Sequence, residues 1–187
     1  MLRHTLLDRA AALVFDRGPD ALSLRRLAAD ANTSTTAVYS LFGNKAGLLD
    51  SLYQEAVRRF AARLATVEAS DDPAADIVAL GVAYRDYALS EPHLYTIMFT
   101  RRQKDDSEDD SEAASTIEPL KDAVRRGQEA GQLVNAPAEL IALACWGVAH
   151  GLVSIELAEI VPPGLDVGAG YEAALRAMVA GWHHPNG

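Results

Sequence analysis

Apolar residues recur every three to four positions along most of the chain, and no stretch alternates apolar and polar residues for long enough to predict a strand. This helical spacing, with glycine, proline and capping residues at the ends, predicts about nine helices. Their expected ranges are 3–17, 24–31, 35–42, 45–67, 73–89, 92–101, 117–130, 137–160 and 170–182. The sequence therefore predicts an all-α protein, with three short helices in front and a larger helical bundle behind them.

The second and third predicted helices are short and lie very close together in the sequence. Asn32 can adopt the left-handed conformation that ends a helix, and Ser34 can cap the next one. Ser23 is the expected cap of the earlier helix, and Val38 faces the core. This spacing is typical of a helix-turn-helix, whose second helix enters the major groove of DNA.

Length and charge indicate two unlike parts. The chain has 187 residues, of which 49% are hydrophobic and 23% charged, as in folded globular proteins. The net charge of −9 argues against a protein that coats nucleic acid through bulk positive charge. However, residues 1–63 hold nine Lys and Arg against six Asp and Glu, and the remaining 124 hold eight against twenty. We therefore predict a small basic domain, 1–46, and a larger acidic domain, 47–187, with a solvated acidic loop from Arg101 to Ser115.

Motifs for catalysis are missing from the sequence. It has no glycine-rich phosphate loop, no His-Glu-x-x-His, no Gly-x-Ser-x-Gly elbow and only one cysteine, Cys145. We therefore expect no enzyme activity, no cofactor and no bound metal, and we interpret His183 and His184 as a frayed tail. A lone cysteine and the lack of a signal-like segment predict a cytoplasmic protein. The apolar stretch Leu140–Leu157 carries His150 and is interpreted as a buried helix, with no contact to a membrane.

The front of the chain resembles the DNA-binding domain of the TetR family of bacterial transcriptional repressors over residues 3–52. The resemblance rests on Leu24–Ala28, Val38–Tyr39, Phe42–Lys45 and Leu48–Leu49. Two positions depart from the family pattern: Asn32 stands at the usual turn glycine, and Leu41 stands where a histidine is common. A leucine offers only apolar contact there, for example to a thymine methyl group.

The resemblance implies that Arg25 reads a base and that Tyr39 and Lys45 bind phosphates. Independently, Lys45 opens a helix whose N-terminal amides also favour a phosphate. The alternatives are a surface salt bridge from Arg25 to Asp30 or Asp50, a half-buried core role for Tyr39 and a solvated charge for Lys45. The full predicted DNA-binding set is Ser23, Arg25, Ser34, Thr35, Thr36, Ala37, Tyr39, Leu41 and Lys45.

Further along, Cys145–Gly151 resembles the Trp-His-Gly signature of one C-terminal subgroup of these regulators, as does Glu91–Phe99. This resemblance implies a helical domain that binds a small-molecule effector and forms dimers. Side chains that combine apolar area with a few polar tips are the candidates for lining the effector cavity, and the alternative for each is a plain core position. They are Tyr84, Tyr87, Tyr95, Met98, Phe99, Trp146 and His150.

The last two long helices are apolar around much of their circumference and predict the interface of a homodimer. Two copies would place two recognition helices one DNA turn apart, about 34–36 Å, and read a pseudo-palindromic operator. The effector would favour a conformation with the wrong spacing, with helix 45–67 as the lever. Two alternatives remain: a fully enclosed helix in a monomer, and a helical adaptor that binds protein rather than DNA.

Overall fold

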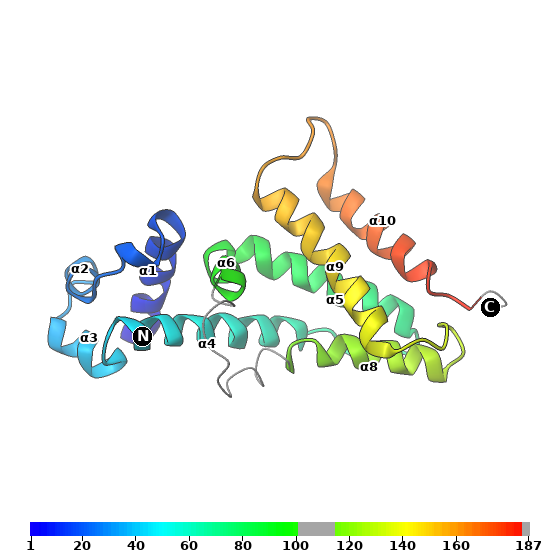
Figure 1. Ribbon diagram of the computed structural model, residues 1–187, viewed down its shortest axis with the longest axis horizontal. Coiled ribbons are helices and arrows are strands. Elements are labelled where there is room, and N and C mark those ends of the chain that lie inside the picture. The colour runs from blue at the N-terminus through cyan, green and yellow to red at the C-terminus, as the bar shows by residue number, and fades with distance from the viewer. Residues whose placement is uncertain (101–114, 185–187) are drawn as a thin grey trace. The chain divides into compact units, whose positions relative to one another are not determined.

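The computed structural model describes residues 1–100 and 115–184. Within these ranges the fold consists of α-helices, one short 3-10 helix, η1 (Pro19–Ala21), and no strand (Figure 1). Each α-helix overlaps one predicted range and ends within three residues of it, so the all-α prediction is confirmed. All of the predicted acidic loop except Ser115, that is residues 101–114, lies outside the described residues. The α-helices are α1 (Leu2–Arg17), α2 (Leu24–Asp30), α3 (Thr35–Phe42), α4 (Lys45–Leu64), α5 (Pro73–Ser90), α6 (Pro92–Thr100), α8 (Glu118–Glu129), α9 (Ala138–Leu157) and α10 (Val167–Ala180).

The described residues form two compact units. The head unit comprises residues 1–59 and 91–100, so α6 belongs to it although α5, which precedes α6 in the chain, does not. Within the head unit α6 packs against α1, and the ring of His93 lies 4.6 Å from that of Phe15. The core of the head unit is made of fully buried aliphatic side chains. They include Leu6, Leu7, Leu27, Val38, Leu48 and Leu52.

The bundle unit comprises residues 60–90 and 115–184, with α5, α8, α9 and α10 packed together. Gly81 of α5 allows α10 to approach closely, because a Cβ there would lie 2.5 Å from a methyl group of Leu175. The hydroxyl of Tyr171 on α10 donates to the carbonyl of Gly81 at 2.8 Å. Arg85 of α5 binds both carboxylate oxygens of Glu156 on α9. These contacts fix α5 between α9 and α10.

Two predictions about the C-terminal region need correction. His183 and His184 are not a frayed tail, because the amide of His184 donates to the carbonyl of Gln132 and that of Val134 to the carbonyl of Trp182. Nor is α9 a buried helix throughout, since Leu140 and Leu143 are 51% and 53% exposed. Among the described residues α9 alone has the length and composition to cross a membrane, a test that core helices of soluble proteins also pass.

Candidate nucleic-acid interface

Local capping sets the two short helices of the head unit. The side chain of Ser23 accepts from the amide of Arg26 at 3.5 Å, and that of Ser34 accepts from the amide of Ala37 at 3.1 Å. Asn32 has a φ of 51°, the left-handed conformation predicted for the turn. Because each cap satisfies an amide at the start of a helix, α2 and α3 begin where the sequence predicted.

One side of α3 is buried and the other is open. Val38 and Phe42 are buried in the core of the head unit. Thr36, Tyr39 and Leu41 are exposed, whereas Thr35 and Ala37 are half-buried. Tyr39 and Leu41 are 46% and 42% exposed, which makes them large side chains without full burial on a short helix. Tyr39 thus reaches the surface from α3, which presents small, polar and aromatic groups outward, and its role as a phosphate contact stays a prediction.

Arg25 is exposed near the start of α2, and no ion pair joins it to another described residue. The salt-bridge alternative for this residue is therefore not seen. Instead the neighbouring Arg26 lies 3.9 Å from Asp30 along the same helix. The Arg25 guanidinium is left with its donors available, as a contact to a base edge requires.

Lys45 is held at the first turn of α4. Its ammonium donates to the backbone carbonyl of Asp20 at 3.2 Å and lies 3.9 Å from the Asp20 carboxylate. The alternative for this residue, a freely solvated charge, is not seen, because Lys45 is held over the 3-10 helix η1. An ammonium has three donors, so one hydrogen bond to a carbonyl leaves two for a phosphate.

The sequence analysis missed three residues of this region. Asn44 caps α4 by accepting from the amide of Gly47 at 3.0 Å. Gly47 is required because a Cβ there would lie 2.2 Å from the carbonyl oxygen of Phe42. Asp20 holds Lys45. An asparagine directly before a predicted helix start is a local signal that could have revealed the first of these. The need for Gly47 comes from the turn between α3 and α4, and only Asp20 is brought to its partner by a tertiary contact.

An ion-pair network joins three helices of the head unit behind this surface. The guanidinium of Arg59 on α4 binds Asp8 of α1 at 2.8 Å, Glu91 at the start of α6 at 3.0 Å and Glu55 at 2.8 Å. Glu55 is buried, and hydrogen bonds from Arg58 first and Arg59 second lower its pKa to about 2, against the opposing effect of burial. The orientation of α4 in the head unit is thus tied to α1 and α6.

The comparisons with known proteins match both parts of the chain. Residues 6–52 match the model of bacterial regulatory proteins of the tetR family, and residues 77–178 match that of the tetracyclin repressor-like C-terminal domain. The second match alone covers more than half of the chain. The chain belongs to the TetR family. Its Trp-His-Gly subgroup stays a prediction.

Solved structures have the same fold. A protein of unknown function from Rhodococcus sp. RHA1 is 27% identical, with a TM-score of 0.85 over 98% of this chain and 96% of that one. The putative regulatory protein SCO4313 is 29% identical, with a TM-score of 0.75 over 94% of each chain. AibR, solved with isovaleryl coenzyme A and operator DNA, is 17% identical, with a TM-score of 0.78 over 95% of this chain and 97% of that one. No curated protein matches significantly.

In this TetR-family chain the predicted effector residues lie in two groups. In the bundle unit, the hydroxyl of Tyr84 lies 2.9 Å from Nδ1 of His150, and the rings of His150 and Trp146 are 6.1 Å apart. Burial lowers the pKa of His150, which favours the neutral imidazole at pH 7. Tyr87 is buried against Phe60. The other members, Tyr95, Met98 and Phe99, are on α6 in the head unit.

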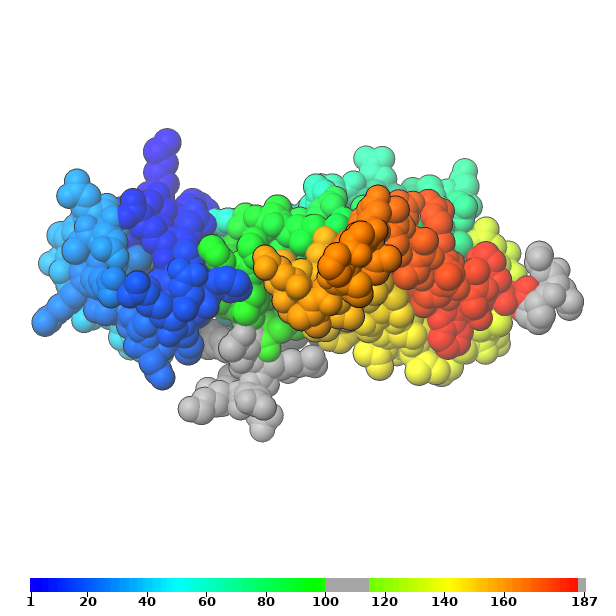
Figure 2. Space-filling model, turned by 90° about the horizontal axis from the view of Figure 1, so that it is seen from above, coloured from blue at the N-terminus to red at the C-terminus, as the bar shows by residue number. Residues whose placement is uncertain are grey.

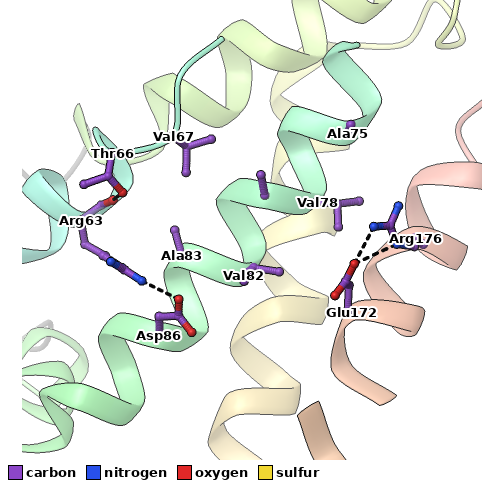
Figure 3. Close-up of a pocket in the computed structure, with 11 residues that line it drawn as sticks. Arg63, Thr66, Val67, Ala75, Val78, Val82, Ala83, Asp86, Glu172 and Arg176 are labelled. Atoms are coloured by element: carbon purple, nitrogen blue, oxygen red, sulfur yellow. Dashed lines mark hydrogen bonds and ion pairs between the residues drawn. The ribbon is translucent and has the colours of Figure 1, made fainter. Parts of the chain in front are cut away.

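A pocket of about 390 Å³ lies elsewhere in the bundle unit, among the end of α4, α5 and α10 (Figure 3). Its walls are mainly valine and alanine, and its rim carries two ion pairs, Arg63 with Asp86 and Arg176 with Glu172. None of the seven predicted effector residues lines it. The lining residues are Arg63, Thr66, Val67, Ala75, Val78, Ala79, Val82, Ala83, Asp86, Glu172 and Arg176.

The remaining feature is an exposed apolar face on α9 and α10, which lie side by side on the surface seen in Figure 2. On α9 it includes Leu140, Leu143 and Ile155. Gly147 and Gly151 have no described atom within 4 Å of the position a Cβ would take, so they do not serve close packing inside the protomer. The exposed part of α10 consists largely of small residues, namely Ala169, Gly170, Ala173, Ala177 and Ala180. A fully enclosed α9 in the protomer is excluded.

Proposed function

We propose that this TetR-family protein is a cytoplasmic transcriptional repressor that binds a pseudo-palindromic operator as a homodimer and is released by a small-molecule effector. It acts by binding and not by catalysis. The observation that carries the proposal is the outward face of α3 beside an unpaired Arg25 and a positioned Lys45. These groups supply the two kinds of contact that a sequence-specific DNA-binding protein needs, to base edges and to phosphates.

Each predicted DNA contact has a distinct role in the proposal. Ser34, Thr35, Thr36 and Ala37 form the narrow N-terminal end of α3, which approaches base edges in the major groove. Leu41, the departure from the family pattern, contacts a thymine methyl group. Ser23, Tyr39 and Lys45 bind phosphates and so contribute to binding of any sequence. Arg25 binds a guanine and so reads one base.

The exposed face of α9 and α10 supports the homodimer. Three large aliphatic side chains and a run of glycine and alanine would stay in water in a monomer. Small residues let helix backbones approach closely, so two copies of this face can form a four-helix interface. A second copy is also what a single head unit needs, since residues 1–59 and 91–100 hold only eight Lys and Arg against seven Asp and Glu.

The group around His150 supports an effector site in the bundle unit. A neutral imidazole, a phenol hydroxyl and an indole ring combine apolar area with a few polar atoms, as small-molecule sites do. The route from effector to DNA follows the chain connections: α5 of the bundle unit leads directly into α6, which is tied to α1 and α4 through Arg59. The effector shifts the population of head orientations.

Selection of bound duplexes from a random pool tests the proposal directly. We expect a pseudo-palindrome whose half-sites are centred about one helical turn apart. Recovery of no enriched sequence at any salt concentration would contradict DNA recognition and favour the protein-binding adaptor. Binding of the selected duplex at 50 and 200 mM salt adds a second readout, because phosphate contacts make affinity fall steeply with salt.

A further inference from the structure

Asp20 is an acidic residue placed beside a proposed phosphate contact. Its carboxylate is fully exposed and lies 3.9 Å from the Lys45 ammonium. Its loop is fixed by Gly18, with a φ of 77°, and by Pro19 at the first position of η1. A carboxylate is an unexpected neighbour for a group that is to receive a DNA phosphate, because the two anions repel each other.

Two different parts of Asp20 contact Lys45. The hydrogen bond that orients the ammonium goes to the backbone carbonyl, which any residue at position 20 supplies. The side chain adds only a through-space attraction at 3.9 Å, longer than a hydrogen bond. Removing the carboxylate therefore leaves Lys45 oriented, and the two contributions can be separated by mutation.

The carboxylate also has a structural benefit. Lys45 occupies the first position of α4, where the helix dipole disfavours a cation and favours an anion. Asp20 compensates for that unfavourable position in the free protein. Stability and DNA affinity consequently respond to Asp20 in opposite directions.

We propose that the Asp20 carboxylate competes with DNA phosphate for Lys45 and so lowers the affinity of the repressor for every duplex. The inference rests on the proposed function, in which Lys45 binds a phosphate. On binding, the ammonium keeps its bond to the Asp20 carbonyl and exchanges the carboxylate for a phosphate oxygen. Since the competition is independent of base sequence, it weakens binding to operator and generic DNA alike.

The test measures the affinity of full-length D20N for the selected duplex and for a duplex of unrelated sequence, at 50 and 200 mM salt. Asp71→Asn, an exposed carboxylate of the bundle unit, is the matched control with the same change of net charge. We expect D20N to bind both duplexes about threefold to tenfold more tightly at 50 mM salt, with a smaller gain at 200 mM. D71N binds as the wild type does, and D20N melts slightly earlier than the wild type.

A double-mutant cycle with Lys45→Gln completes the test. In the K45Q background, D20N gains almost nothing, because the contested cation has been removed. Unchanged or weaker binding by D20N, or an equal gain in both backgrounds, would overturn the competition. Wild-type affinity in K45Q alone would instead contradict the proposed role of Lys45, so the two failures are distinguishable.

Discussion

At the scale of single residues, the proposed DNA contacts fall into two kinds: those expected to read base sequence and those expected to bind the DNA backbone. Arg25 is an exposed cation and Lys45 a half-buried one, and of the two only Lys45 is held by a described neighbour. A long side chain without an ion pair can reach a base edge, whereas a positioned ammonium at a helix start is suited to a phosphate. Substitutions at these two positions should therefore have different signatures.

We expect Arg25→Ala to relax the preference at one position of each half-site by about 1–3 kcal/mol, because a bidentate contact to guanine is lost. Lys45→Gln is the matched comparison and should weaken binding to all duplexes by a similar factor. Affinities for the selected duplex and its single-base variants distinguish the two. An R25A variant with the wild-type ranking of variants would show that Arg25 reads no base.

Glu55 predicts a pH dependence of stability in the head unit. Its pKa falls from the usual 4.5 in the unfolded chain to about 2 in the folded protein. The stabilisation is therefore fully present above about pH 4.5 and is lost as the pH falls towards 2. Glu55→Gln should lower the free energy of unfolding by on the order of 2–3 kcal/mol at pH 7, because Arg58 and Arg59 lose their buried partner.

Urea titrations at pH 7 and pH 3 check this prediction. The difference in the free energy of unfolding between wild type and E55Q should narrow at pH 3, because the Glu55 carboxyl is then mostly protonated in the unfolded chain. Glu68→Gln, which changes an exposed carboxylate after α4, is the control and should match the wild type at both values. A difference of constant size would mean that folding does not lower the pKa of Glu55.

At the scale of elements, the close turn between α3 and α4 predicts a strong requirement for glycine. Gly47→Ala should cost more than about 2 kcal/mol of stability, because the added Cβ meets a backbone carbonyl that cannot move aside. Gly168→Ala, in the first turn of α10, is the matched control, since a Cβ there meets no described atom nearer than 3.5 Å. Thermal melts of both variants test the difference; equal melting temperatures would contradict it.

Helix ends could be predicted from sequence because their signals are local. Ser23, Ser34 and Asn32 act on backbone groups within three residues of themselves. The partners of Arg59 could not, since Asp8 is 51 and Glu91 is 32 residues away in sequence. The predicted effector residues could not be grouped from sequence for the same reason. Tyr95 and His150 are both predicted on the basis of their aromatic side chains, but tertiary packing places them in different units.

At the scale of the whole molecule, the proposed dimer interface on α9 and α10 predicts that oligomeric state and operator binding change together. Leu143→Glu should shift the protein from dimer to monomer, because it places a charge at the centre of the proposed interface. Operator affinity should fall by a hundredfold or more, roughly, since one head unit then acts alone. Sedimentation velocity and duplex titration measure the two effects.

Leu89→Glu is the control for this change. Leu89 is also an exposed leucine, 39% exposed at the end of α5, but it lies outside α9 and α10. The variant should remain dimeric and bind the operator. If the L143E variant stays dimeric and binds the operator as tightly as the wild type, the dimer interface does not lie on this face.

The assignment of α6 to the head unit has a practical consequence for dissection of the protein. A fragment that stops after α4 leaves out the helix whose His93 covers Phe15 and whose preceding Glu91 binds Arg59. Such a fragment further exposes Phe15, which is already 48% exposed, and leaves the Arg59 guanidinium with fewer counterions, although it contains every proposed DNA contact. We expect this fragment to be prone to aggregation. A fragment with residues 91–100 attached to it by a linker should be soluble.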